Sequence, residues 1–147
     1  MKSDVRIVTS INGFKKLKEY INTYIKEHPE NKELSNILDK VDLKYESNKQ
    51  CYFGWNEYDW DEYFNKSVEL VVNGLMELED NNYSYRFYRL GEDKEDYDEH
   101  HFDATIKSEQ DLEYPNITRA FDDRYVCDIL HIERQNADLN KEDFDYE

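Results

Sequence analysis

The sequence contains few cysteine, proline and glycine residues, which build disulfide-linked or glycine-rich structures. Among 147 residues there are two cysteines, two prolines and four glycines. Cys51 and Cys127 lie far apart and outside any paired spacing, which argues against a disulfide framework and against a zinc site built on cysteine pairs. We expect both to be buried structural residues. The few glycines form no phosphate-binding loop, and no G-x-S-x-G element surrounds a nucleophilic serine.

Long apolar runs are also missing. No stretch approaches the ~20 apolar residues that a membrane-spanning helix requires. The first residues, MKSDVRIVTSINGF, contain no apolar segment and no small-residue cleavage site of the kind found in signal peptides. Asn, Lys and Tyr each occur thirteen times, and their AT-rich codons point to a low-GC bacterial or phage genome. We therefore expect a cytoplasmic protein of a bacterial host cell, without membrane association.

Acidic residues are what the chain has in excess. Charged residues make up 37% of it, against ~25% in ordinary domains, and the formal net charge is −16. Residues 1–50 carry ten basic and eight acidic side chains, whereas residues 51–147 carry nine and twenty-seven. The entire negative excess therefore lies in the last two thirds of the chain. Such a field repels nucleic acid and anionic membranes and attracts basic surfaces.

The apolar pattern predicts a folded α+β domain, and an aromatic content of 15% argues against disorder. Near-alternating β-branched residues predict a strand at 4–10, and apolar residues three and four apart predict a helix from about residue 11 to His28. A second, short helix is expected after Asn31. A longer helix is expected at 60–80, with Phe64 in its core stripe. Further strands are expected at 41–47, 50–55, 83–90 and 125–134.

These elements predict a largely antiparallel sheet with helices on one face. The first six follow the ferredoxin-like βαββαβ order, and the last is an extra C-terminal strand. We expect a single α+β domain over residues 1–137, followed by an acidic tail at 138–147.

One segment, LGEDKEDYDEHHFD (Leu90–Asp103), contains seven carboxylates and two adjacent histidines. A calcium loop needs a glycine bend within its acids, but Gly91 precedes them. His100 and His101 would point to opposite faces of an extended chain and could not share one metal ion. The acid-x-lysine element Asp42-Leu43-Lys44 is too short to indicate a metal-dependent nuclease. We therefore predict no catalytic residues, no metal site and no cofactor.

Acids alternate with aromatic residues in two segments, NEYDWDEY (Asn56–Tyr63) and the one just described. Carboxylates two residues apart in an extended chain lie ~6.5–7 Å apart on one face, close to the spacing of phosphates. Aromatic side chains between them add contact area and cation–π partners for arginine. The plainer alternative is a solvated acidic surface, with about half of these aromatics in the core. The predicted partner-binding residues are Glu57, Tyr58, Asp59, Trp60, Asp61, Glu62, Glu92, Asp93, Glu95, Asp96, Tyr97, Asp98 and Glu99.

The stretch NGLMELEDNNYSYRFYRLGED (Asn73–Asp93) resembles small acidic accessory proteins of phages and prophages of low-GC bacteria. Anti-CRISPR proteins and other anti-defence inhibitors are the best-known functional group in this class. Several are acidic and compact, resemble DNA in charge and block the DNA-reading surface of a CRISPR effector. The resemblance implies a non-enzymatic inhibitor whose partner is a basic nucleic-acid-binding protein such as a CRISPR effector nuclease, with no direct nucleic-acid contact.

Two alternatives stay open at the level of sequence. An immunity protein that neutralises a bacterial toxin nuclease would have the same charge and a different partner. A metal-dependent enzyme that uses Leu90–Asp103 would belong to another class and is less favoured.

Overall fold

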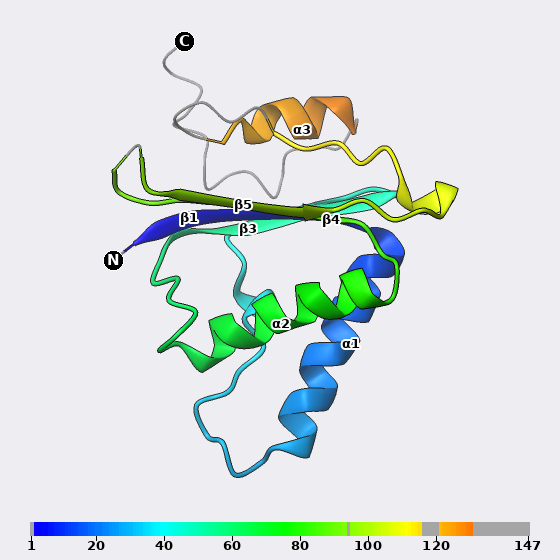
Figure 1. Ribbon diagram of the computed structural model, residues 1–147. Coiled ribbons are helices and arrows are strands. Elements are labelled where there is room, and N and C mark those ends of the chain that lie inside the picture. Colours follow the sequence, from blue (N-terminus) through cyan, green and yellow to red (C-terminus); the bar gives the residue numbers. More distant parts are fainter. Residues whose placement is uncertain (1, 94, 116–120, 131–147) are drawn as a thin grey trace.

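The computed structural model describes residues 2–93, 95–115 and 121–130, which form one sheet with helices on both faces (Figure 1). The sheet has five strands in the order β2-β3-β1-β4-β5, and every neighbouring pair is antiparallel. The strands are β1 (Ser3–Ser10), β2 (Leu43–Glu46), β3 (Gln50–Tyr58), β4 (Tyr85–Leu90) and β5 (Tyr97–Phe102).

β1 is the central strand and is covered on both faces. Val5 and Ile7 point toward one core and Val8 toward another, and all three are 0% exposed. β-Branched residues suit such a strand because their stiff side chains pack well on a pleated surface. β3 and β4 pair directly with β1, and β2 and β5 pair with those two strands on the outside.

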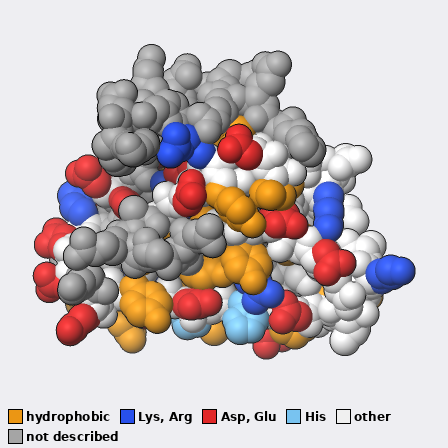
Figure 2. Space-filling view, turned by 90° about the horizontal axis from the view of Figure 1, so that it is seen from above, with side chains coloured by type: hydrophobic (Ala, Val, Ile, Leu, Met, Phe, Trp, Pro, Cys, Tyr) orange, Lys and Arg blue, Asp and Glu red, His pale blue; other side chains and the backbone are white. Residues whose placement is uncertain are grey.

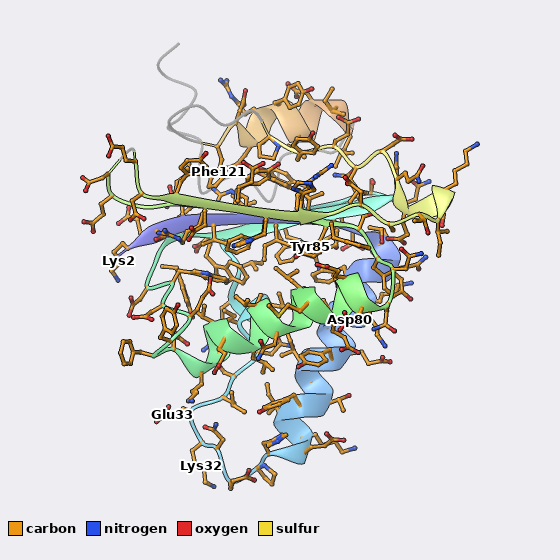
Figure 3. All side chains as sticks on the ribbon, viewed as in Figure 1. Lys2, Lys32, Glu33, Asp80, Tyr85 and Phe121 are labelled. Atoms are coloured by element: carbon orange, nitrogen blue, oxygen red, sulfur yellow. The ribbon has the colours of Figure 1, made fainter. Side chains whose placement is uncertain are left out.

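Two helices cover one face of the sheet, α1 (Ile11–Glu27) and α2 (Lys66–Asp80). The Ser10 side chain accepts a hydrogen bond from the Gly13 amide, and Asn65 accepts from the second and third residues of α2, so both helix starts are capped. Figure 3 shows Tyr85 of β4 pointing to this side of the sheet. Phe53, Trp55 and Phe87 fill the core beneath the helices.

The other face carries a third helix, α3 (Asp123–Ile129), and Phe121 lies on this side of the sheet in Figure 3. A buried ion pair attaches α3 to the sheet. Nε and Nη2 of Arg6, on β1, each lie 3.0 Å from a carboxylate oxygen of Asp123, and the Tyr52 hydroxyl donates to the same carboxylate. Burial lowers the pKa of the Arg6 guanidinium, but the adjacent Asp123 carboxylate raises that pKa above its ordinary value. Arg6 therefore stays charged inside the protein.

Several expectations from the sequence are confirmed. The strand at 4–10, the helix from residue 11 and the strands expected at 41–47, 50–55 and 83–90 are present as β1, α1, β2, β3 and β4. His28 caps the C-terminal end of α1, and Cys51 and Cys127 are buried. In the described part of the chain, the helices are too short or too polar to cross a membrane.

Other expectations about the architecture are wrong. In the described residues, the six elements β1-α1-β2-β3-α2-β4 are followed by β5 and α3, so the element order as a whole departs from the ferredoxin-like βαββαβ order. The helices lie on both faces of the sheet, because Asp123 binds Arg6 on the face opposite α1 and α2. The extra strand comes from the acidic segment, as β5, and residues 123–129 are helical instead. Leu130 ends this helix, and residues 131–134 of the expected strand and the tail at 138–147 lie outside the described residues.

Two helices also differ from the prediction. The segment after Asn31 forms no α-helix and contains one 3-10 turn at Ile37–Lys40, capped by Asn36. α2 begins at Lys66 and not at residue 60, because the Asn65 side chain caps it there. Phe64 therefore precedes the helix and is 84% exposed, so its expected place in the core stripe is wrong.

Replacing Asp123 with alanine should lower the free energy of unfolding by roughly 3 kcal/mol, because a buried guanidinium would lose its counter-charge. Urea denaturation followed by tryptophan fluorescence would measure this change. Asp128→Ala is a matched control, since Asp128 is exposed on the same helix. The control should change stability by less than ~0.5 kcal/mol, and equal effects of the two substitutions would contradict the assigned role of Asp123.

Candidate partner-binding face

The two acidic segments, far apart in the sequence, lie at the same end of the molecule. One follows β3 and leads into α2, and the other forms the hairpin between β4 and β5 (Figure 1). β1 brings them together, because it pairs with β3 on one side and with β4 on the other. Figure 2, which looks onto the α3 face, shows acidic side chains along the side on which the hairpin lies in Figure 1, and others over the rest of this face.

The two segments enclose a hollow of about 440 Å³, which we call the acidic hollow. Its walls contain five carboxylates and one guanidinium, a formal charge of −4 with histidine neutral. A concave site of this charge suits a guanidinium or ammonium group and repels phosphate. The acidic hollow is lined by Ser3, Asp59, Trp60, Asp61, Glu62, Tyr63, Arg89, Asp96, Asp98 and His100.

Arg89 organises the wall formed by the hairpin. Its Nη2 donates to Asp96 at 2.6 Å and its Nε donates to Asp98 at 2.9 Å. Its Nη1 donates to the Ser3 hydroxyl at 2.9 Å and so links the hairpin to β1. The hydrogen bond from Arg89 also lowers the pKa of the Asp96 carboxyl. Two carboxylates of the predicted binding face are therefore paired within the protein.

The other wall is held by a turn. Oδ1 of Asp61 accepts hydrogen bonds from the Tyr63 amide at 3.0 Å and the Phe64 amide at 3.1 Å. β3 ends at Tyr58, so the acids at 59 and 61 do not form the extended ladder that the sequence suggested. The carboxylates in this loop line a concave wall instead of a phosphate-like row.

The structure brings together about half of the predicted partner-binding residues. The members that line the acidic hollow are Asp59, Trp60, Asp61, Glu62, Asp96 and Asp98. Trp60 is a wall residue and not a projecting contact, because it is 7% exposed and packs against Trp55 and Phe87. The predicted residues outside the hollow are Glu57, Tyr58, Glu92, Asp93, Glu95, Tyr97 and Glu99.

Most of these outer residues lie on the hairpin or at the end of β3. Tyr58 is half-buried against the two tryptophans. Glu57 is exposed and has a φ of 48°, and its amide donates to the Asp4 carboxylate at 2.9 Å. The exposed acids of the hairpin add to the field around the hollow without lining it.

Reasoning from the sequence missed Ser3, Arg89 and His100. Arg89 lies opposite Asp98 in the register of β4 and β5, so a hairpin assignment for residues 85–102 would have paired them. Nothing in the sequence indicates that Ser3 belongs to the site, since it reaches the site only because β1 and β4 are neighbours. His100 and His101 do point to opposite faces, as expected, with His100 beside Phe87 and His101 beside Arg86.

Large apolar side chains are exposed beside the hollow. Tyr63 is 87% exposed, Phe64 84% and Met76 58%. Aromatic residues and methionine are enriched in the centres of protein interfaces, where they supply buried contact area. This end of the molecule therefore combines negative charge with exposed apolar surface.

No family model, curated protein or solved structure matches the chain. Its function is therefore inferred from the charge and shape of this end of the molecule.

Two observations in the described residues bear on nucleophilic and metal chemistry. Burial raises the pKa of the Cys51 thiol to about 12, so this thiol stays protonated near neutral pH and is a poor nucleophile. Among residues 2–93, 95–115 and 121–130, no three His, Cys, Asp or Glu side chains are grouped so that they could hold a metal ion.

Replacing Arg89 with glutamine should loosen the hairpin, because both ion pairs with Asp96 and Asp98 are lost. The Gly91 amide, which donates to the Asp96 carbonyl at 2.7 Å, is a suitable reporter of hydrogen exchange. We expect the free energy of local opening to fall by about 1 kcal/mol. The pKa of Asp96 is lowered in the folded state, so this contribution is present above the ordinary carboxyl pKa of ~4 and is lost as the pH falls through the lowered value.

Arg86→Gln provides the control, because Arg86 lies on the same strand and pairs with Asp103, outside the turn. If both substitutions changed exchange at Gly91 equally, the specific role of Arg89 would be wrong.

Proposed function

We propose that the protein is a non-enzymatic inhibitor that binds a basic, nucleic-acid-handling protein and competes with its DNA or RNA. The observation that carries the proposal is the acidic hollow, in which two separate acidic segments meet. A nucleic-acid-binding surface presents lysine and arginine side chains spaced to contact phosphates. An arginine or lysine of that surface would enter the hollow and would no longer be available to nucleic acid.

The distribution of charge supports a one-sided mode of binding. Residues 1–50 are nearly neutral, and the acidic excess follows them. In Figure 3, Lys32 and Glu33, which belong to this nearly neutral part of the chain, lie at the tip of the loop after α1, away from the end that carries the hairpin. An approaching basic protein would therefore be oriented toward the acidic end before contact.

Single exposed ion pairs contribute only ~0.2–1 kcal/mol each. The combined field acts mainly on the rate of encounter, which can rise 10–10³-fold and falls steeply with ionic strength. Binding should therefore weaken with salt, as does the binding of nucleic acid to the same surface. The resemblance to anti-CRISPR proteins favours a CRISPR effector or another defence nuclease as the partner.

A displacement assay tests this proposal. Purified CRISPR effectors, restriction nucleases and toxin nucleases would each be bound to fluorescent DNA or RNA, and the protein would be titrated in at several salt concentrations. Displacement from a defence nuclease would support the proposal, and direct binding of the protein to that nuclease should weaken as the salt concentration rises. Action on a toxin nuclease alone would indicate an immunity protein, and no displacement from any of them would reject competition with nucleic acid.

Reversing two charges in the hollow, with Asp59→Lys and Glu62→Lys, should weaken displacement by about a hundredfold, because like charges would then face the partner. Glu30→Lys with Glu33→Lys makes the same change in net charge on exposed residues of the loop after α1. This control should displace nucleic acid nearly as well as the unchanged protein. Equal losses in both variants would mean that total charge acts and that the acidic hollow does not.

A further inference from the structure

An apolar groove adjoins the acidic hollow. It has a volume of about 130 Å³ and lies between α2 and the outer strands of the sheet. Val72, Leu75 and Met76 of α2 form one side, and Phe87 and His100 lie on the other. Its size suits one aliphatic side chain and no larger ligand.

The groove and the hollow are continuous. Glu62 and His100 line both. On β5, Asp98 lines the hollow and His100 lines the groove two residues further along. Alternate residues of a strand lie ~6.5–7 Å apart on one face, so the acidic and apolar sites are separated by about that distance.

The fold does not account for the apolar side chains exposed near this boundary. Tyr63 lines the hollow, Met76 lines the groove and Phe64 follows Tyr63, yet all three are more than half exposed. Apolar side chains surrounded by carboxylates are typical of a protein interface and not of a solvated surface.

We infer that the groove binds an apolar side chain of the same partner segment that places an arginine in the acidic hollow. This inference rests on the proposed function and specifies the partner: an extended segment with an arginine and, two residues away, an aliphatic residue such as leucine. In an extended chain, side chains two residues apart lie on one face at the spacing of Asp98 and His100.

Arginine fits the hollow better than lysine for two reasons. Its planar guanidinium can pair with two carboxylates at once, and the hollow presents Asp59, Asp61 and Glu62 on one wall. Its flat face can also stack on the exposed ring of Tyr63. Negative charge alone would bind any basic surface, whereas the groove adds selectivity for the residue two positions from the arginine.

Two capped pentapeptides would test this inference by titration into isotope-labelled protein, followed by NMR. One has the sequence Gly-Arg-Gly-Leu-Gly and the other has glycine in place of leucine. The leucine peptide should bind about tenfold more tightly, which corresponds to ~1.4 kcal/mol. It should also shift the signals of Leu75 and Met76, which line the groove and not the hollow, whereas the glycine peptide should shift those around the hollow alone.

Met76→Gln should remove the tenfold gain from leucine and leave binding of the glycine peptide unchanged. Ile106→Gln is the control, because Ile106 is similarly exposed (51%) and lines neither site. Equal affinities for the two peptides, or a gain from leucine that survives Met76→Gln, would overturn the inference.

Three further outcomes distinguish failure of the groove inference from failure of the proposed function. A protein dimer in sedimentation that Met76→Gln dissociates would assign the groove to a second copy of the chain and reject a partner segment. If the leucine gives no gain while nuclease displacement still depends on Asp59 and Glu62, the groove fails and the proposed function stands. If neither peptide binds and no nuclease is displaced, both fail.

Discussion

The buried contact between Arg6 and Asp123 is the constraint on which the two-faced architecture depends. β1 presents aliphatic residues to α1 and α2, but on its other face it presents a guanidinium that water cannot reach. A buried charge is tolerable only when it is paired and hydrogen-bonded. Asp123 supplies the counter-charge, and the carbonyls of Val5 and Trp55 accept from Nη1 at 2.9 and 3.1 Å. Gly54 leaves the necessary space, because a Cβ there would lie 2.8 Å from the Arg6 Cδ.

At the acidic end, the electrostatic constraint is repulsion among carboxylates. Many like charges repel one another and would open the hairpin. Arg89 offsets part of this repulsion by holding Asp96 and Asp98 in place, and it still leaves the hollow with a formal charge of −4. The carboxylates are thus arranged before any partner arrives, which lowers the entropic cost of binding. The apolar surface beside them would supply contact area that charge alone does not.

The parts of the fold that could be predicted are those with a strong local period. β1 and α1 follow directly from the spacing of their apolar residues. The errors arose where a distant contact overrides a local pattern. Residues 125–129 have the sequence pattern of a strand, yet they are helical. Their helix begins at Asp123, which binds Arg6, a residue more than a hundred positions earlier in the chain. Phe64 fits the helical period of α2 but precedes its cap at Asn65 and is exposed.

The sequence by itself determined the composition of the proposed binding face: which segments are acidic, which aromatic residues accompany them, and that the first third of the chain is nearly neutral. Charge and composition are properties of the chain and need no fold. The tertiary structure decided that the two acidic segments meet, because β1 pairs with both β3 and β4. It also decided that Trp60 is buried and Tyr63 exposed. These outcomes depend on contacts between residues far apart in the chain, which local periodicity does not encode.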